Sequence, residues 1–131
     1  MRTFKFRAWN KKTNIWQHKE PCDLIGECIL YGYWLSGVRI SELNDIVIMQ
    51  FTEMYDKKEN EIFEGDIVKA DSHNPSLYIV EYIEGGFCCT YKGCIPIDIN
   101  HFYPSIGCQI EVVGNIFDNP ELKKSINDTI Q

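Results

Sequence analysis

Apolar and polar residues alternate along most of the chain with a period of two, which predicts β-strands rather than helices. Phe4, Phe6 and Ala8 share one side of a first strand, with basic residues between them. The polar stretch 10–14 then provides a turn, after which residues 15–17 return beside the first strand. The chain is therefore predicted to begin with a β-hairpin.

The middle of the chain contains further predicted strands. Residues 46–51 are apolar on both faces, which is typical of a central strand that is covered on both sides. Residues 77–83 and 87–91 flank the turn sequence Glu-Gly-Gly at 84–86 and indicate a second hairpin. This spacing of strands and turns predicts a mainly β architecture.

Two turns between these strands have particular backbone requirements. In the charged turn 56–60, Asn60 is expected to adopt the left-handed conformation, which asparagine reaches at low cost. Gly65 lies between two short strand sequences and can supply a positive φ. The carboxylate of Asp66 can accept hydrogen bonds from nearby backbone amides. Gly65 and Asp66 are therefore expected to act structurally.

The C-terminal part is predicted to be a strand followed by a short helix. Residues 109–117 alternate, and three apolar residues are expected on one face: Ile110, Val112 and Ile116. Asn119 is a suitable N-cap, and Pro120 suits the first helical position. The apolar residues of the helix recur every four positions: Leu122, Ile126 and Ile130.

The length of 131 residues suits a single domain, 1–131, in which residues 20–45 are either an integral part or a separate lobe. Hydrophobic residues make up 44% and charged residues 24% of the chain, which is ordinary for a globular protein and excludes disorder. No apolar run reaches the roughly 20 residues that cross a bilayer, and no signal-peptide pattern is present. We therefore expect a cytoplasmic protein without membrane attachment.

Charge is distributed unevenly along the chain. Residues 1–19 contain six basic residues and no acidic one, whereas the rest contains seven basic and 19 acidic residues, and the net charge is −6. Because phosphate contacts require positive charge, this acidity disfavours diffuse nucleic-acid binding but leaves a local basic strip.

The six cysteines, at positions 22, 28, 88, 89, 94 and 108, do not form the closely spaced pairs of zinc sites. Disulfides are typical of short exported chains, and an export signal is absent here. We therefore expect free, mostly buried thiols, with no metal and no cofactor.

Three segments together resemble the YopX family, small proteins of bacteriophages and prophages. They read Phe-Lys-Phe-Arg-Ala-Trp-Asn at 4–10, Glu-Ile-Phe-Glu-Gly-Asp-Ile-Val at 61–68 and Val-Val-Gly-Asn-Ile-Phe-Asp-Asn-Pro-Glu-Leu at 112–122. The resemblance implies a β-rich fold with a small SH3-like, partly open barrel, to which the N-terminal hairpin and C-terminal helix are added. It also implies phage or prophage origin, a location in the bacterial cytoplasm and self-association, but no established activity.

The chain departs from the family pattern in its turns. Asn10 stands where the family usually has aspartate, and Thr-Glu-Met at 52–54 replaces the usual Thr-Gly-Leu. A glycine that is usual in the next turn is replaced near Glu59, next to Asn60. These changes concern local turn geometry rather than any charged site.

No constellation of catalytic residues stands out in the sequence. His101 and Cys108 could form a thiol–imidazole pair, but no nucleophile-bearing turn surrounds them. Glu64 and Asp66 could share a strand face as acid–base or Mg²⁺ pairs do, but the glycine between them marks a turn. We therefore do not expect an enzyme.

The most suggestive feature is a basic, aromatic strip in the N-terminal hairpin: Lys5, Arg7, Trp9, Lys11, Lys12 and Trp16. Small barrels use such mixtures to bind single-stranded nucleic acids. Lysines also protect edge strands, and a basic arm is attracted to acidic surface on its own chain or on a neighbour. We expect a non-catalytic module that binds its own copies or a phage or host protein; single-stranded nucleic-acid binding is the alternative.

Overall fold

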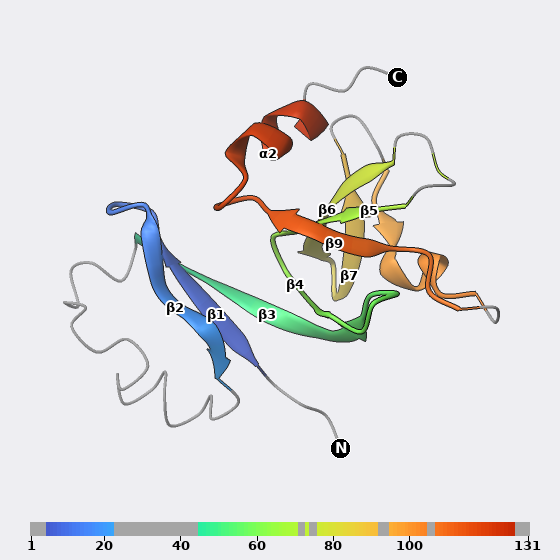
Figure 1. Ribbon diagram of the computed structural model, residues 1–131, viewed down its shortest axis with the longest axis horizontal. Coiled ribbons are helices and arrows are strands. Elements are labelled where there is room, and N and C mark those ends of the chain that lie inside the picture. Colours follow the sequence, from blue (N-terminus) through green and yellow to red (C-terminus); the bar gives the residue numbers. More distant parts are fainter. Residues whose placement is uncertain are drawn as a thin grey trace. The chain divides into compact units, whose positions relative to one another are not determined.

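The computed structural model describes residues 5–22, 45–70, 73, 76–91, 95–104 and 107–127 (Figure 1). The chain divides into two compact units, residues 1–53 and residues 54–131, with the boundary inside strand β3 (Ile46–Tyr55). Most of the segment 20–45 lies outside the described residues, as do Ile130 and two of the cysteines, Cys28 and Cys94. The single domain 1–131 stays a prediction.

The first unit contains an antiparallel hairpin. Strands β1 (Phe6–Asn10) and β2 (Ile15–Cys22) pair with Trp9 opposite Trp16, and β1 pairs on its other side with β3. Among the described residues, the order in this sheet is β2-β1-β3-β4, where β4 spans Glu61–Phe63. The predicted N-terminal hairpin is confirmed.

The turn of this hairpin is held by the side chain of Asn10. Its Oδ1 atom accepts hydrogen bonds from the backbone N–H of Lys12 at 2.9 Å and of Thr13 at 3.1 Å. Asn14 has a φ of +57°, a left-handed conformation that asparagine adopts readily. An amide oxygen thus accepts the same bonds that a carboxylate could accept, so replacing the usual aspartate of the family keeps this turn possible.

Strand β3 lies between β1 and β4 in the order of its sheet, as expected for a central strand. Met49 and Phe51 are buried, but Ile48, on the opposite face, is 37% exposed. The prediction that residues 46–51 are covered on both faces is therefore wrong at Ile48. An apolar run shows which residues can be buried, but not whether another element covers each face.

The second unit is built on an antiparallel sheet that curls into a half-barrel (Figure 1). Its strand order is β8-β7-β6-β5-β9. These strands span Asp66–Lys69 (β5), Leu77–Ile83 (β6), Gly86–Thr90 (β7), Ile97–Asp98 (β8) and Glu111–Asn115 (β9), with a 3-10 helix η2 at Ile99–Phe102 and helix α2 at Pro120–Asn127. The prediction of a mainly β fold with a partly open barrel and a short C-terminal helix is confirmed.

Apolar side chains pack on both faces of this sheet. Adjacent residues of β5 point to opposite faces, so Val68 enters one cluster and Ile67 the other. The larger, inner cluster consists of Ile62, Val68, Ala70, Tyr78, Val80, Cys89, Ile99, Phe102 and Ile110. On the outer face, Ile67 and Ile79 pack with Ile126 of α2. The helix therefore covers part of the outer face.

A bulge in β9 changes the face on which its side chains lie. Val68 is opposite Val112, but Ile67 is opposite Gly114, which leaves Val113 as an extra, exposed residue. Because of this shift, Ile110 and Val112 belong with the inner cluster, whereas Ile116 packs in the outer one. The prediction that Ile110, Val112 and Ile116 share one face is therefore wrong.

The turn at Gly65 and Asp66 has the geometry that its sequence requires. Gly65 has a φ of +83°, and its N–H donates to the carbonyl of Val80 at 2.8 Å. The buried carboxylate of Asp66 accepts a hydrogen bond from the N–H of Phe63 at 2.8 Å. Gly65 therefore provides the positive φ of this turn, and Asp66 provides a hydrogen-bond acceptor for its backbone.

The second hairpin has a two-residue turn. Ile83 is opposite Gly86, and the residues between them, Glu84 and Gly85, have φ values of +49° and +87°. Two positive φ values are typical of the type I′ turn, whose twist matches that of the paired strands. The predicted hairpin is confirmed.

The charged turn 56–60 places its left-handed residue one position earlier than expected. Glu59 has a φ of +67°, whereas Asn60 uses its backbone N–H and its side-chain amide to bind Asp56, at 2.8 Å and 3.3 Å. The prediction for Asn60 is therefore wrong. Glu59 occupies the place near which the family usually has glycine, the residue that suits a positive φ.

Helix α2 begins at Pro120, directly after Asn119, as predicted, but the side chain of Asn119 binds β9. The backbone carbonyl of Asn119 accepts from the N–H of Leu122 at 3.0 Å and of Lys123 at 3.2 Å, but its Oδ1 atom accepts from the N–H of Asn115 at 3.1 Å. A Cβ atom on Gly114 would lie only 2.8 Å from Cγ of Asn119. Asn119 thus fastens the start of the helix back to β9. Within the described residues, no helix is long and apolar enough to span a bilayer.

The carboxylate of Asp56 accepts several hydrogen bonds from backbone amides. Oδ1 accepts from the N–H of Lys58 at 2.9 Å and of Asn60, and Oδ2 accepts from the N–H of Val112 in β9 at 2.8 Å. Burial by itself would raise the pKa of Asp56, but these hydrogen bonds favour the charged form and bring the pKa below its ordinary value. The ionised carboxylate therefore stabilises the fold.

Replacing Gly65 with valine is expected to lower the free energy of unfolding by about 1–3 kcal/mol, because a β-branched residue is strained at positive φ. The control is Gly86→Val, since Gly86 begins β7 without a positive φ and nothing lies within 4 Å of an added Cβ. Urea unfolding of both variants checks this. Equal stability of the two variants would show that the turn does not need glycine.

Asp56→Asn is expected to lower the free energy of unfolding at neutral pH by about 1–3 kcal/mol, because an amide accepts at only one of its two atoms. The folded-state pKa is lowered, so the contribution is complete above the unfolded pKa of about 3.9 and is lost as the pH falls through the folded-state pKa. Urea unfolding over this pH range should show the two proteins converging in acid. Glu59→Gln, an exposed carboxylate of the same turn, is the control, and a pH-independent difference would contradict the assignment.

Candidate basic hairpin and acidic face

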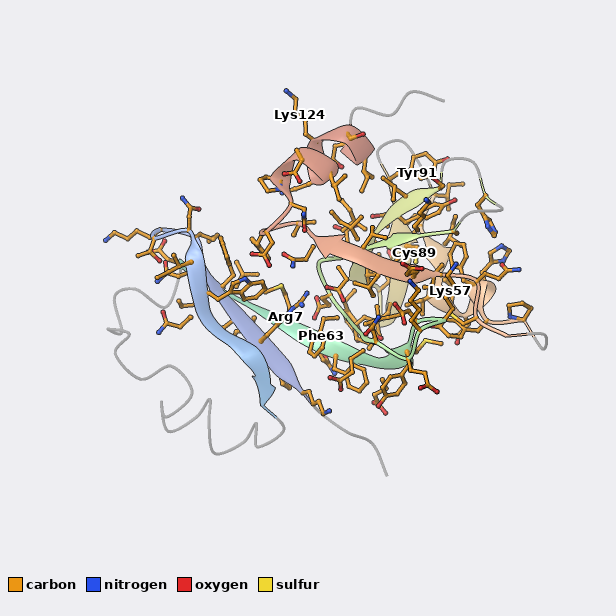
Figure 2. All side chains as sticks on the ribbon, in the orientation of Figure 1. Arg7, Lys57, Phe63, Cys89, Tyr91 and Lys124 are labelled. Atoms are coloured by element: carbon orange, nitrogen blue, oxygen red, sulfur yellow. The ribbon has the colours of Figure 1, made fainter. Side chains whose placement is uncertain are left out.

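The six residues of the predicted basic strip divide between the β1–β2 strands and their turn. Lys5 immediately precedes β1, and Arg7 and Trp9 follow on the same face of the strand by alternation (Arg7 is labelled in Figure 2). Trp16 lies on β2, directly opposite Trp9. The remaining two residues, Lys11 and Lys12, are exposed in the turn.

On the strands, the cations lie against aromatic rings of the same unit. The guanidinium carbon of Arg7 is 5.2 Å from the centroid of the Trp16 ring, and the Trp9 and Trp16 rings are in edge contact at 5.2 Å and 82°. The Nζ atom of Lys5 lies 5.6 Å from the centroid of the Phe51 ring. Arg7 is 9% and Trp9 8% exposed. We call these five residues the cation–aromatic cluster.

At the turn, the side chains instead face solvent. Lys11 and Lys12 are exposed, and Ile15, which follows the turn, is 61% exposed. We call these three residues the hairpin tip. The predicted strip therefore divides into two surfaces. In the cation–aromatic cluster, the cations contact aromatic rings, whereas in the hairpin tip two lysines are exposed. Phe51 and Ile15 were not predicted as part of the strip. Alternation places Phe51 on the same face as Met49, and Ile15 is the apolar residue next to the turn.

A second charged surface lies on the outer face of the half-barrel. Cys88 of β7 is opposite Glu81 of β6 on one side and Asp98 of β8 on the other, so the three side chains form a row across the sheet. Burial raises the pKa of the Cys88 thiol, and the carboxylates of Asp98, Glu81 and Glu84 raise it further, which places Glu84 near the same row. We call these four residues the acidic face. Because the register of three strands brings them together, the sequence alone does not predict this face.

The described thiols are free, and burial raises the pKa of two of them, Cys88 and Cys89. Cys88, Cys89 and Cys108 form no disulfide, and burial raises the pKa of Cys89 to about 12 (labelled in Figure 2). The side chains of the other three cysteines, Cys22, Cys28 and Cys94, lie outside the described residues. A protonated, buried thiol is a poor nucleophile.

The candidate catalytic residues have other contacts in the structure. The ring of His101 contacts the rings of His73 at 5.9 Å and Phe102 at 5.3 Å, whereas Sγ of Cys108 lies 3.5 Å from both the N and the O atoms of Ile110. Asp66 is bonded to the backbone of its own turn. Across the described part of the chain, no group of three or more His, Cys, Asp and Glu residues could hold a metal ion. The expected absence of metal and cofactor stays a prediction.

A family model described as YopX protein matches residues 5–124 of the chain. The chain belongs to the YopX family. Among solved structures, it resembles the crystal structure of protein EF1440 from Enterococcus faecalis with a TM-score of 0.56 and 22% sequence identity, over 92% of this chain and 97% of that chain. At this identity, the likeness concerns the fold. No curated protein matches the chain.

Cys89 is expected to resist iodoacetamide in the native YopX family protein at about pH 8, because a thiol with a pKa of about 12 is ionised there in only about one molecule in 10⁴. In urea, Cys89 should react at the rate of an ordinary thiol. Fragment-ion mass spectrometry separates Cys89 from Cys88 in the same peptide. Rapid native alkylation of Cys89 would contradict its burial.

Proposed function

We propose that this YopX family protein is a non-catalytic accessory protein of a phage or prophage that acts in the bacterial cytoplasm through protein–protein contacts, including contacts with its own copies. The observation that carries this proposal is the hairpin tip, where two lysines and Ile15 are exposed together on a turn whose shape Asn10 holds. A rigid turn that combines an apolar residue with like charges suits recognition of an acidic protein surface.

The polar groups inside the described parts support a binding role over a catalytic one. Asn10, Asp56 and Asp66 all accept hydrogen bonds from backbone amides within or near turns. The pKa of Cys89 is raised, away from the range of a nucleophile. A catalytic group needs a pKa near the operating pH and a partner to activate it. Asn10, Asp56 and Asp66 instead accept hydrogen bonds from backbone N–H groups.

Single-stranded nucleic-acid binding is the second candidate, and the exposed pair Lys11 and Lys12 favours it. Bases stack on aromatic faces that are open to solvent. In the cation–aromatic cluster, however, the ring of Trp16 already contacts Arg7 and Trp9. Two exposed lysines without an open aromatic platform form a weak nucleic-acid site, and the acidic chain repels nucleic acid at long range.

The proposal predicts that Lys11→Gln/Lys12→Gln loses a protein partner that the wild type captures from infected or prophage-carrying cells. The control, Lys123→Gln/Lys124→Gln, removes two exposed lysines from α2, where Lys124 points away from the helix in Figure 2, and should keep the partner. Immobilised full-length chain and quantitative mass spectrometry, with nuclease treatment, measure recovery. A near-stoichiometric, nuclease-resistant protein that only the tip variant loses is the expected result.

Direct binding to fluorescent single-stranded oligonucleotides separates the two candidates. The wild type should give no change in anisotropy at physiological salt. Micromolar binding that weakens steeply with salt and disappears in the tip variant would favour nucleic-acid recognition, because such binding depends on phosphate contacts. Such oligonucleotide binding, together with failure to capture a protein partner, would overturn the protein-contact proposal.

A further inference from the structure

We draw no further inference here: the strongest candidate, the surface patch on the inner face of the β6–β7 hairpin where the half-exposed ring of Tyr82 contacts Phe87, carries nothing because nothing in the described part of the chain shows what covers it.

Discussion

Asp56 places a buried, ionised carboxylate between the turn after β3 and the strand β9, whose residue Val112 lies 56 positions later in the chain. Burial opposes the charge, so this arrangement is stable only because backbone amides from both segments donate to the carboxylate. Two further hydrogen bonds connect the segment 55–57 to residues that come shortly before β9. The hydroxyl of Tyr103 donates to the carbonyl of Tyr55 at 2.6 Å, and the N–H of Lys57 donates to the carbonyl of Ile110 at 2.9 Å. Together they fix where the chain returns to complete the second unit.

The return of β9 gives β5 a partner on each side, and this allows its side chains to be buried on both faces of the sheet. The bulge at Val113 then lets one strand serve both clusters, because the extra residue exchanges the faces of the positions that follow it. Asn119 bonds back to Asn115 and so brings α2 over Ile67. The helix is thus held by packing and by its connection to β9, since eight residues would be marginal alone.

The same division between buried and exposed polar groups supports the proposed function. The side chains of Asn10, Asp56 and Asp66 bind backbone amides within their own units. Exposed charges of one sign lie near one another at the hairpin tip of the first unit and on the acidic face of the second. A group of like charges is suited to recognition of an oppositely charged surface.

Local residue preferences allowed much of the fold to be predicted from the sequence. Period-two alternation, the turn at Gly65 and the helix that begins at Pro120 depend on residues close in the chain, and family motifs at the start, middle and end indicated the barrel. The candidate site could be predicted only as residue types, because alternation does not show that Arg7 faces an aromatic ring while the lysines of the turn face solvent. The left-handed Glu59, the faces exchanged at Val113 and the acidic face all depend on contacts or strand register between segments distant in sequence. Tertiary structure decided these features because their free energies come from partners that no local pattern identifies.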